Sequence, residues 1–232
     1  MNLLPPRLSN KLSRLAHRGL AKLERWYIQR HQYPSQPSLF ILGLPRSGTT
    51  IVYQYLVHRL KVAYFCNGVD HFPEAPCLTT LFRKMIAGEH SSDFQNTYGY
   101  APGFASPHEA GNVWARFFGY HDYVELQDVT KESRTTLKRT IAGAESVFGK
   151  APFVNKNVKH LLRLKALAGI FPNARFLIVQ RRMQDVALSL LRGRYANKGT
   201  ADSFWSARPP NAEELANLPP HEQIPCQLLA LT

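Results

Sequence analysis

A short apolar run that leads into two spaced glycines constrains this chain more than any other feature. Residues 38–44 (SLFILGL) are strand-sized and mostly apolar, and they enter the spacing Gly43-x-x-x-x-Gly48. Residues 49–60 then follow the pattern of a helix. A strand, a glycine turn and a helix start in this order point successive backbone N–H groups inward, beside the positive end of the helix. The segment therefore predicts a loop that binds phosphate.

Further strands and helices alternate along the chain. Strands are expected at residues 61–65, 152–155 and 174–180. Helices are expected at residues 76–88, 107–119, 132–148, 159–170 and 184–195, with a partly helical stretch from Asn211. Strands that alternate with helices predict a parallel sheet covered on both faces. We therefore expect an α/β fold, with a P-loop NTPase-like parallel sheet flanked by helices.

The chain has 232 residues, enough for one α/β domain with a full core. We expect residues 1–37 to form a basic helical arm with a linker, and residues 38–232 to form the domain. In the arm, leucines recur at helical spacing with cations between them: Leu8, Leu12, Leu15, Leu20 and Leu23 alternate with Arg7, Lys11, Arg14, Arg18, Lys22 and Arg25. The pattern predicts an amphipathic helix. We favour a helix that docks on the domain with its charged face in water over one that contacts a membrane surface or a partner.

Composition narrows the class of protein. No apolar run reaches the roughly 18–20 residues of a membrane helix, and the basic N-terminus lacks the apolar core of a secretory signal. Cys66, Cys77 and Cys226 have no paired spacing, which suits a reducing compartment and supplies no metal-ligand set. We therefore expect a cytoplasmic protein without a bound metal.

The formal net charge of +13 attracts anions over long range. Nucleic acid, an anionic membrane and a polyphosphorylated small molecule are all compatible with it. The sequence lacks the interleaved aromatic and basic residues of a nucleic-acid-binding module. Together with the glycine loop, this favours the small molecule and argues against nucleic acid.

The residue after the second glycine separates this loop from that of nucleotide triphosphatases. Those proteins place Lys there to reach the β and γ phosphates, whereas this chain has Thr49. The cation of the loop is Arg46 instead, and Thr49 and Thr50 add hydroxyl groups. A P-loop kinase is therefore disfavoured.

The run Pro45-Arg46-Ser47-Gly48-Thr49-Thr50 after an apolar strand resembles the 5′-phosphosulfate-binding loop of the sulfotransferases. The resemblance implies that Arg46, Ser47, Gly48, Thr49 and Thr50 bind PAPS (3′-phosphoadenosine 5′-phosphosulfate). It also implies transfer of the sulfuryl group to a hydroxyl or amine, with release of PAP. An ordinary glycine turn is the competing interpretation, and six matching residues between a strand and a helix argue against it.

A second block of sequence is similar to the same family. Arg181 follows the strand expected at residues 174–180, and Ser189 stands eight residues later in the following helix. The family carries Arg and Ser at this spacing to bind the 3′-phosphate of PAPS, so the resemblance assigns that role to Arg181 and Ser189. Arg offers a planar fork that suits phosphate. The family usually continues with Asp-Pro or Asn-Pro, where this chain has Arg182-Met183.

Sulfuryl transfer needs cations at the leaving group and a base at the acceptor. Arg46 is one cation, and the resemblance assigns the other to Lys156, at the end of the strand expected at residues 152–155. A surface lysine is the alternative interpretation of Lys156.

Three side chains remain open as the base. Asp70 and Glu109 stand near carboxylate positions of bacterial and tyrosylprotein-type relatives, and we rank them equally. His108 comes third because cytosolic members use His, and His71 is weaker still.

The resemblance covers roughly residues 38–195. Family members generally continue with a further helical region, so we expect a shortened or truncated relative. A nucleotide-binding relative without turnover is therefore the alternative function. The sequence does not indicate the acceptor, and a carbohydrate, lipid, peptide or small metabolite would fit.

Overall fold

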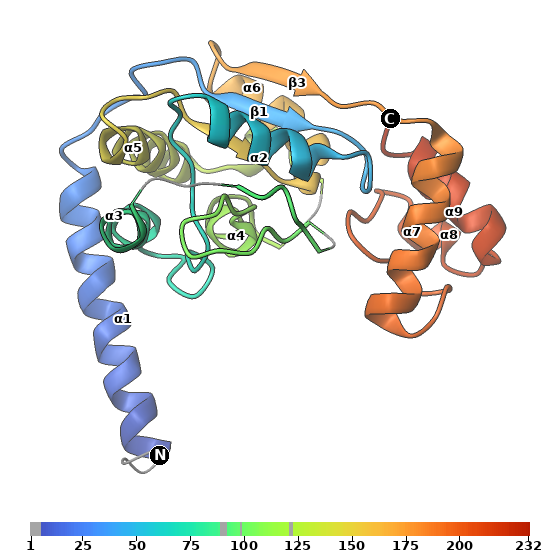
Figure 1. Ribbon diagram of the computed structural model, residues 1–232, viewed down its shortest axis with the longest axis horizontal. Coiled ribbons are helices and arrows are strands. Elements are labelled where there is room, and N and C mark those ends of the chain that lie inside the picture. The colour runs from blue at the N-terminus through green and yellow to red at the C-terminus, as the bar shows by residue number, and fades with distance from the viewer. Residues whose placement is uncertain (1–5, 89–91, 98, 121–122) are drawn as a thin grey trace.

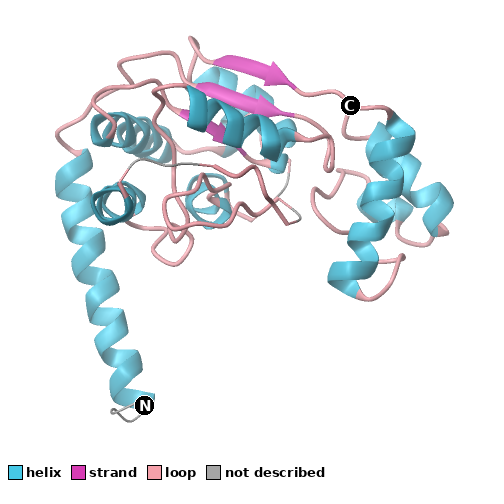
Figure 2. Cartoon of the chain, viewed as in Figure 1, coloured by secondary structure: helices cyan, strands magenta, loops and turns pink. Residues whose placement is uncertain are grey.

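A computed structural model describes residues 6–88, 92–97, 99–120 and 123–232, with the side chains of the first helix from residue 16 onward. Its strands form one parallel sheet in the order β2-β1-β3, with β1 spanning Leu39–Leu42, β2 Val154–Lys156 and β3 Arg175–Ile178. Figure 2 shows these strands in the upper part of the body, with most helices below them. The strands expected at residues 38–44, 152–155 and 174–180 are all present, each slightly shifted or shortened.

Helices cover both faces of the sheet because successive residues of β1 point to opposite sides. Phe40 belongs to a core cluster with residues of α4 (Gly111–Phe118), α5 (Lys131–Val147) and α6 (Leu164–Ile170). Ile41 belongs to a second cluster with residues of α2 (Thr49–Arg59). In Figure 1, α2 lies in front of β1 and α6 lies behind it. The expected α/β fold, a parallel sheet flanked by helices, is confirmed.

The strands β1 and β3 differ in burial. Phe40, Ile41 and Leu42 of β1 are at most 2% exposed, whereas Ile178 of β3 is 62% exposed. The loop that follows β1 therefore begins at the end of a strand that is packed on both faces.

The strand expected at residues 61–65 is not formed. The segment is extended and mostly buried, but it makes a single parallel bridge, from Ala63 to Phe153. Ala63 N donates to Pro152 O at 2.9 Å, and Val154 N donates to Ala63 O at 2.8 Å. The ladder stops there because the chain turns away, and Cys66 pairs instead with Pro107.

The helix expected over residues 107–119 is α4, which begins only at Gly111. His108 N donates to Phe65 O at 2.8 Å, and Ala110 has a left-handed φ of 56°. These tertiary contacts keep His108 and Glu109 out of the helix. The helix expected at residues 159–170 is likewise split, into the 3₁₀ helix η2 (Val158–Arg163) and α6.

The N-terminal arm is the helix α1 (Pro6–Ile28), and only its C-terminal part packs on the body (Figure 1). Both oxygens of the buried Glu24 carboxylate accept 2.9 Å hydrogen bonds from the backbone of Cys77 and Leu78, at the start of α3 (Pro76–Ala87). The helix thus docks with its described cations in water, as favoured. The docking face is not the leucine stripe, however, since Leu23 is 58% exposed. The side chains of Leu8, Leu12 and Leu15 lie outside the described part.

A helical layer formed by α7 (Met183–Lys198), α8 (Ala212–Leu215) and α9 (Pro220–Leu229) stands beyond the carboxyl ends of the strands (Figure 1). Its core includes Val186, Leu190 and Leu228. The buried Arg194 ties α7 to α9 by donating to Gln223 Oε1 at 2.5 Å and Gln227 Oε1 at 2.8 Å. This layer places α7 beside the loop after β1.

Candidate active site

The loop between β1 and α2 closes too tightly for a side chain at its first glycine. A Cβ on Gly43 would lie 2.6 Å from Ser47 Oγ and 2.7 Å from Val179 O. Gly48 has a φ of 99° and Arg46 a φ of 71°, in the left-handed region. The loop therefore curls over the end of β1, and the N-terminus of α2 faces the space above it.

A cavity of about 330 Å³ lies over this loop, and we call it the loop cavity. Cations from separate segments share its walls: Arg46, Lys156 and Arg181. Gly48, Thr49 and Thr50 of the loop line it as well. Cations beside a helix N-terminus make this a favourable place for an anion.

Arg46 joins the two predicted phosphate motifs. Its Nε donates to Ser189 Oγ of α7 at 3.1 Å. Its backbone oxygen accepts from a guanidinium nitrogen of Arg181 at 3.3 Å. Its guanidinium also lies 5.9 Å from the ring centre of Trp205. Arg181 and Ser189 are therefore brought to one side of the loop cavity, although Ser189 does not line it.

The loop also meets two requirements of a nucleotide phosphate. Gly48 lines the loop cavity and a Cβ there would meet nothing within 4 Å, so the backbone is open to a ligand at that point. Ser47 Oγ is buried beside Gly43 and has no hydrogen-bond partner among the described residues. With the cations of the loop cavity, these donors fit the phosphate and sulfate oxygens of PAPS. Ser47 does not line the cavity, whereas Thr49 and Thr50 do.

Lys156 and Glu109 form an ion pair in the wall of the loop cavity. Lys156 ends β2 opposite Ile41 and is 3% exposed. The residues on either side of Lys156 hold the Glu109 segment. Asn155 Nδ2 donates to His108 O at 3.3 Å, and Asn157 Nδ2 donates to Glu109 O at 3.1 Å. Asn155 and Lys156 of β2, with Asn157 just after it, thus fix the backbone of His108 and Glu109 and the carboxylate of Glu109.

Asn155 is itself held from the core. Its Oδ1 accepts from Trp114 Nε1 at 3.0 Å and lies 2.9 Å from His160 Nε2. Burial holds the pKa of His160 well below its usual range. Neither Asn155 nor Asn157 was predicted as a site residue. Their position on either side of the candidate Lys156 could have indicated them.

A second cavity of about 470 Å³ adjoins the loop cavity. The two share wall residues: Gly99, Glu109, Val158 and Ser206. A Cβ on Gly99 would lie 3.1 Å from Glu109 Oε1 and 3.8 Å from both Lys156 Nζ and Thr50 Oγ1. Thr50, Lys156 and Glu109 therefore converge where the two cavities meet. Gly99 and Ser206 were not predicted as site residues.

The three candidate bases differ in their surroundings. Asp70 caps α4, because its Oδ1 accepts from Asn112 N at 3.0 Å. His108 Nδ1 accepts from Ala110 N at 3.0 Å, and burial lowers the pKa of His108. Both line the second cavity only, whereas Glu109 lines both cavities. His71 is exposed and lines neither.

A family comparison decides which proteins this chain is related to. The model of the sulfotransferase family matches residues 37–212. The chain belongs to the sulfotransferase family. The predicted resemblance is thereby confirmed at the level of the family, over more than the stretch from which it was inferred.

Individual relatives of this sulfotransferase are more distant. The omega-hydroxy-beta-dihydromenaquinone-9 sulfotransferase Stf3 of Mycobacterium bovis is 24% identical over 164 residues, which are 63% of this chain and 42% of that protein. The protein of the same name from Mycobacterium tuberculosis gives the same values. This chain thus spans less than half the length of these curated relatives. The crystal structure of sulfotransferase STF9 from Mycobacterium avium aligns with a TM-score of 0.48 and 17% identity, over 83% of this chain and 56% of that one.

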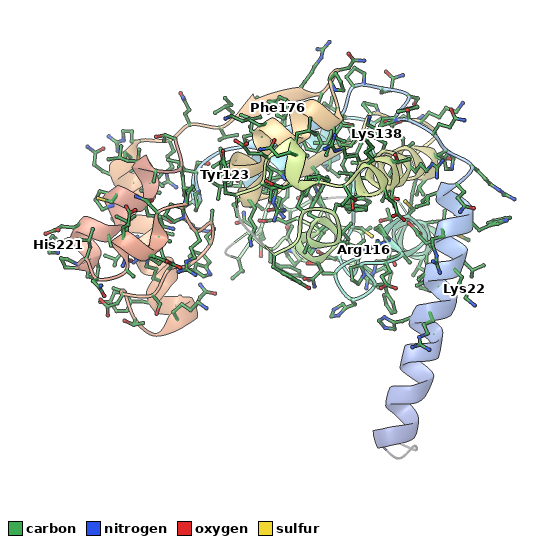
Figure 3. The ribbon with its side chains drawn as sticks, turned by 180° about the vertical axis from the view of Figure 1, so that it is seen from behind. Lys22, Arg116, Tyr123, Lys138, Phe176 and His221 are labelled. Atoms are coloured by element: carbon green, nitrogen blue, oxygen red, sulfur yellow. The ribbon has the colours of Figure 1, made fainter. Side chains whose placement is uncertain are left out.

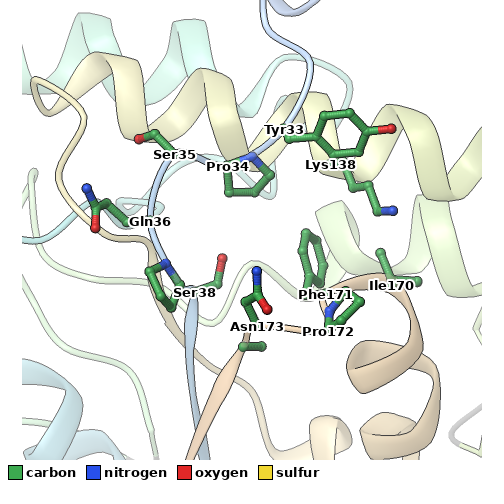
Figure 4. Close-up of a pocket in the computed structure, with 12 residues that line it drawn as sticks. Tyr33, Pro34, Ser35, Gln36, Ser38, Lys138, Ile170, Phe171, Pro172 and Asn173 are labelled. Atoms are coloured by element: carbon green, nitrogen blue, oxygen red, sulfur yellow. The ribbon is translucent and has the colours of Figure 1, made fainter.

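A third cavity of this sulfotransferase lies at the amino ends of β1 and β3 (Figure 4). Its walls include Ser38, just before β1, and Asn173, just before β3, together with Lys138 of α5. The carboxyl ends of the strands carry the loop cavity, so this third cavity is separate from the convergence of Lys156 and Glu109.

Among the described residues of this sulfotransferase, no three His, Cys, Asp or Glu side chains are grouped as a metal ion would require. In the same part of the chain, every helix is too short or too polar to cross a membrane.

Proposed function

We propose that this sulfotransferase transfers the sulfuryl group of PAPS to a hydroxyl group of an acceptor held in the second cavity. One observation carries the proposal: the cationic loop cavity meets the second cavity at Glu109. A donor and an acceptor bound in the two cavities would face each other across the Lys156–Glu109 ion pair.

Residues of two motifs would hold the donor. The backbone of Gly48, with the hydroxyls of Thr49 and Thr50, would bind the 5′-phosphosulfate at the start of α2. Arg181 and Ser189 would bind the 3′-phosphate. When bound, PAPS supplies a sulfuryl group activated by a phosphate leaving group.

The protein's own groups divide the remaining work. The Glu109 carboxylate takes the proton of the acceptor hydroxyl, a role that general bases fill within hydrogen-bond reach. Arg46 and Lys156 neutralise the negative charge that grows on the leaving side. Lys156 begins paired with Glu109, so its turn toward the loop cavity frees the carboxylate for the acceptor.

The curated relatives suggest the class of acceptor to test first. Their names describe sulfation of a hydroxylated menaquinone, which is a lipid alcohol. We therefore propose a hydroxylated lipid as the acceptor, ahead of the carbohydrate, peptide and small-metabolite classes. We also propose that the protein works in the cytoplasm, with residues 38–232 as its catalytic domain.

Calorimetric binding of PAP tests the donor site. The wild-type protein should bind PAP, and Arg181→Ala should weaken binding by at least tenfold, as for the loss of a charged hydrogen bond worth about 1.5–3 kcal/mol. Arg182→Ala is the matched control, because Arg182 points to Asp185 and is 82% exposed at its side chain. Equal losses in both variants, or no binding by the wild type, would contradict the proposed donor site.

Transfer of labelled sulfate from PAPS to a hydroxylated lipid tests turnover. Lys156→Ala should lower kcat about 10²–10³-fold, as for other lost transition-state donors. Lys165→Ala should not, since Lys165 is 78% exposed and pairs with Glu125. Binding of PAP without turnover on any acceptor class would support the alternative function, a nucleotide-binding relative that lost catalysis. Hydrolysis of ATP would support a kinase.

A further inference from the structure

The arm helix α1 has two different apolar faces, and only one of them docks on the domain. The His17 ring lies tilted against that of Phe72 with ring centroids 4.7 Å apart, and Tyr27 donates to Gly143 O at 3.0 Å. Glu24 and Ile28 are at most 4% exposed. These residues follow helical spacing and form one stripe, which we call the docking stripe.

A second stripe runs along the opposite side of α1. Its positions in the sequence are 8, 12, 15, 19, 23 and 26, which repeat every three or four residues. Leu23 is 58% exposed and Trp26 56% exposed, although both are large and apolar. At about 3.6 residues per turn, these positions lie nearly opposite the docking stripe. We call them the outer stripe, and the domain leaves its described part uncovered.

Cations run beside the outer stripe. Each of its positions is preceded in the sequence by Arg or Lys: Arg7, Lys11, Arg14, Arg18, Lys22 and Arg25. Arg18, Lys22 and Arg25 are exposed. The helix contains one acidic residue, Glu24, whose two oxygens are occupied by backbone N–H groups of α3. The described exposed surface of α1 is therefore apolar and cationic, and the helix itself has no exposed acidic side chain there to balance it.

This arrangement matches one kind of partner. Helices that lie in the plane of a membrane place an apolar stripe below the headgroups and keep Lys and Arg at their level. Figure 1 shows α1 extending away from the body, and Figure 3 shows it at the edge of the molecule, with Lys22 labelled on it. Because the domain docks on the other side of the helix, it would not obstruct the outer stripe.

We propose that α1 seats this protein on an anionic membrane surface through its outer stripe and the adjoining cations. Charge complementarity selects this partner, since each Lys or Arg near an anionic leaflet favours binding. The inference stands apart from the catalytic proposal, because none of the described residues of α1 lines the loop cavity or the second cavity.

Flotation of the full chain with vesicles tests the proposal. The wild type should float with vesicles that contain about a quarter phosphatidylglycerol and remain behind with phosphatidylcholine alone, and added salt should weaken binding. Leu23→Ser with Trp26→Ser, and separately Arg18→Gln with Lys22→Gln, should each lower the bound fraction about tenfold. Leu229→Ser and Lys165→Gln are matched controls, because both residues are exposed and lie off α1.

The fluorescence of Trp26 reports membrane contact in the wild-type protein itself. Its emission should shift to shorter wavelength when anionic vesicles are added to the wild type, and the shift should vanish in Trp26→Phe. Failure of the wild type to bind anionic vesicles, or equal binding by the stripe variants and the controls, would overturn the proposal. A dimer that forms without lipid and that Leu23→Ser with Trp26→Ser converts to monomers would also overturn the proposal. The outer stripe would then be an interface between two copies.

Discussion

The Arg46 guanidinium donates a 3.1 Å hydrogen bond to the hydroxyl of Ser189, 143 residues further along the chain. One residue comes from the loop after β1, and the other from the second turn of α7. The resemblance to sulfotransferases assigned them to opposite ends of the donor, the 5′-phosphosulfate and the 3′-phosphate. Their hydrogen bond therefore joins the two side chains that are proposed to bind the two ends of the donor.

This contact predicts non-additive effects on PAP binding. In a cycle of Arg46→Gln, Ser189→Ala and the double variant, we expect a coupling energy of about 0.5–3 kcal/mol, the range for residues in contact. Calorimetry measures the three affinities against the wild type. The pair Arg182→Gln and Ser189→Ala is the control and should be additive within about 0.5 kcal/mol. Additivity in the Arg46 cycle would show that the contact does not matter for the donor.

Substitution of the candidate bases should separate them. Glu109→Gln keeps the shape of the side chain but removes its basic oxygen, so kcat should fall about 10²–10⁴-fold. PAP affinity should stay within a few-fold, because Gln still accepts a hydrogen bond from Lys156. Asp70→Asn should have a much smaller effect on kcat, since Asn also accepts from Asn112 N. Turnover that survives Glu109→Gln and is lost in Asp70→Asn would reverse the assignment.

Gly43→Ala should abolish the loop geometry. The added Cβ would lie 2.7 Å from the backbone oxygen of Val179, which cannot swing away as a side chain can. We expect PAP affinity to fall at least tenfold and stability to fall by about 1–3 kcal/mol, the usual effect of overpacking. Gly19→Ala is the control, because a Cβ on that helical glycine has nothing within 4 Å. PAP binding by Gly43→Ala with the affinity of the wild type would contradict the close packing described for Gly43.

Stability should fall with acid partly because of His160. Burial lowers the pKa of His160 well below its usual value of 6.5, so the folded protein keeps the ring neutral. Below about pH 6.5 the unfolded chain binds a proton that the folded one does not, and the free energy of unfolding falls by up to about 1.4 kcal/mol per pH unit. Denaturant unfolding at about pH 7 and about pH 5 measures this loss, which should be smaller in His160→Gln. Burial also lowers the pKa of His108, so the free energy of unfolding of His160→Gln should still fall with acid. Equal slopes in the two proteins would contradict the account.

Sequence reasoning succeeded where local chemistry decides the structure. The apolar run before Gly43 could only be a short buried strand, and the helix after Gly48 follows from a pattern within a dozen residues. The strand before Arg181 and the helix that carries Ser189 likewise follow from the local pattern, whereas the role of these two residues comes from the resemblance to sulfotransferases and stays a prediction. Each of these features depends on neighbours in the chain.

The predictions from the sequence were wrong where contacts between distant segments decide the structure. Residues 107–110 have a helical pattern, but Phe65, Asn155 and Asn157 bind the backbone of His108 and Glu109 and hold these residues out of the helix. That choice places Glu109 against Lys156, a contact that no local pattern contains. The arm shows the same limit: the leucine spacing is visible in the sequence, but which face of α1 meets the domain depends on α3 and α5.

The Lys156–Glu109 ion pair has a thermodynamic consequence. Each partner lines the loop cavity, and Glu109 also lines the second cavity, so Glu109 neutralises one cation of the loop cavity in the resting site. In the proposed function, a donor anion that attracts Lys156 leaves Glu109 more available to the acceptor. Linkage is reciprocal, so an acceptor that engages Glu109 would change the affinity of the loop cavity for the donor by the same factor. The ion pair would then couple binding in the two cavities.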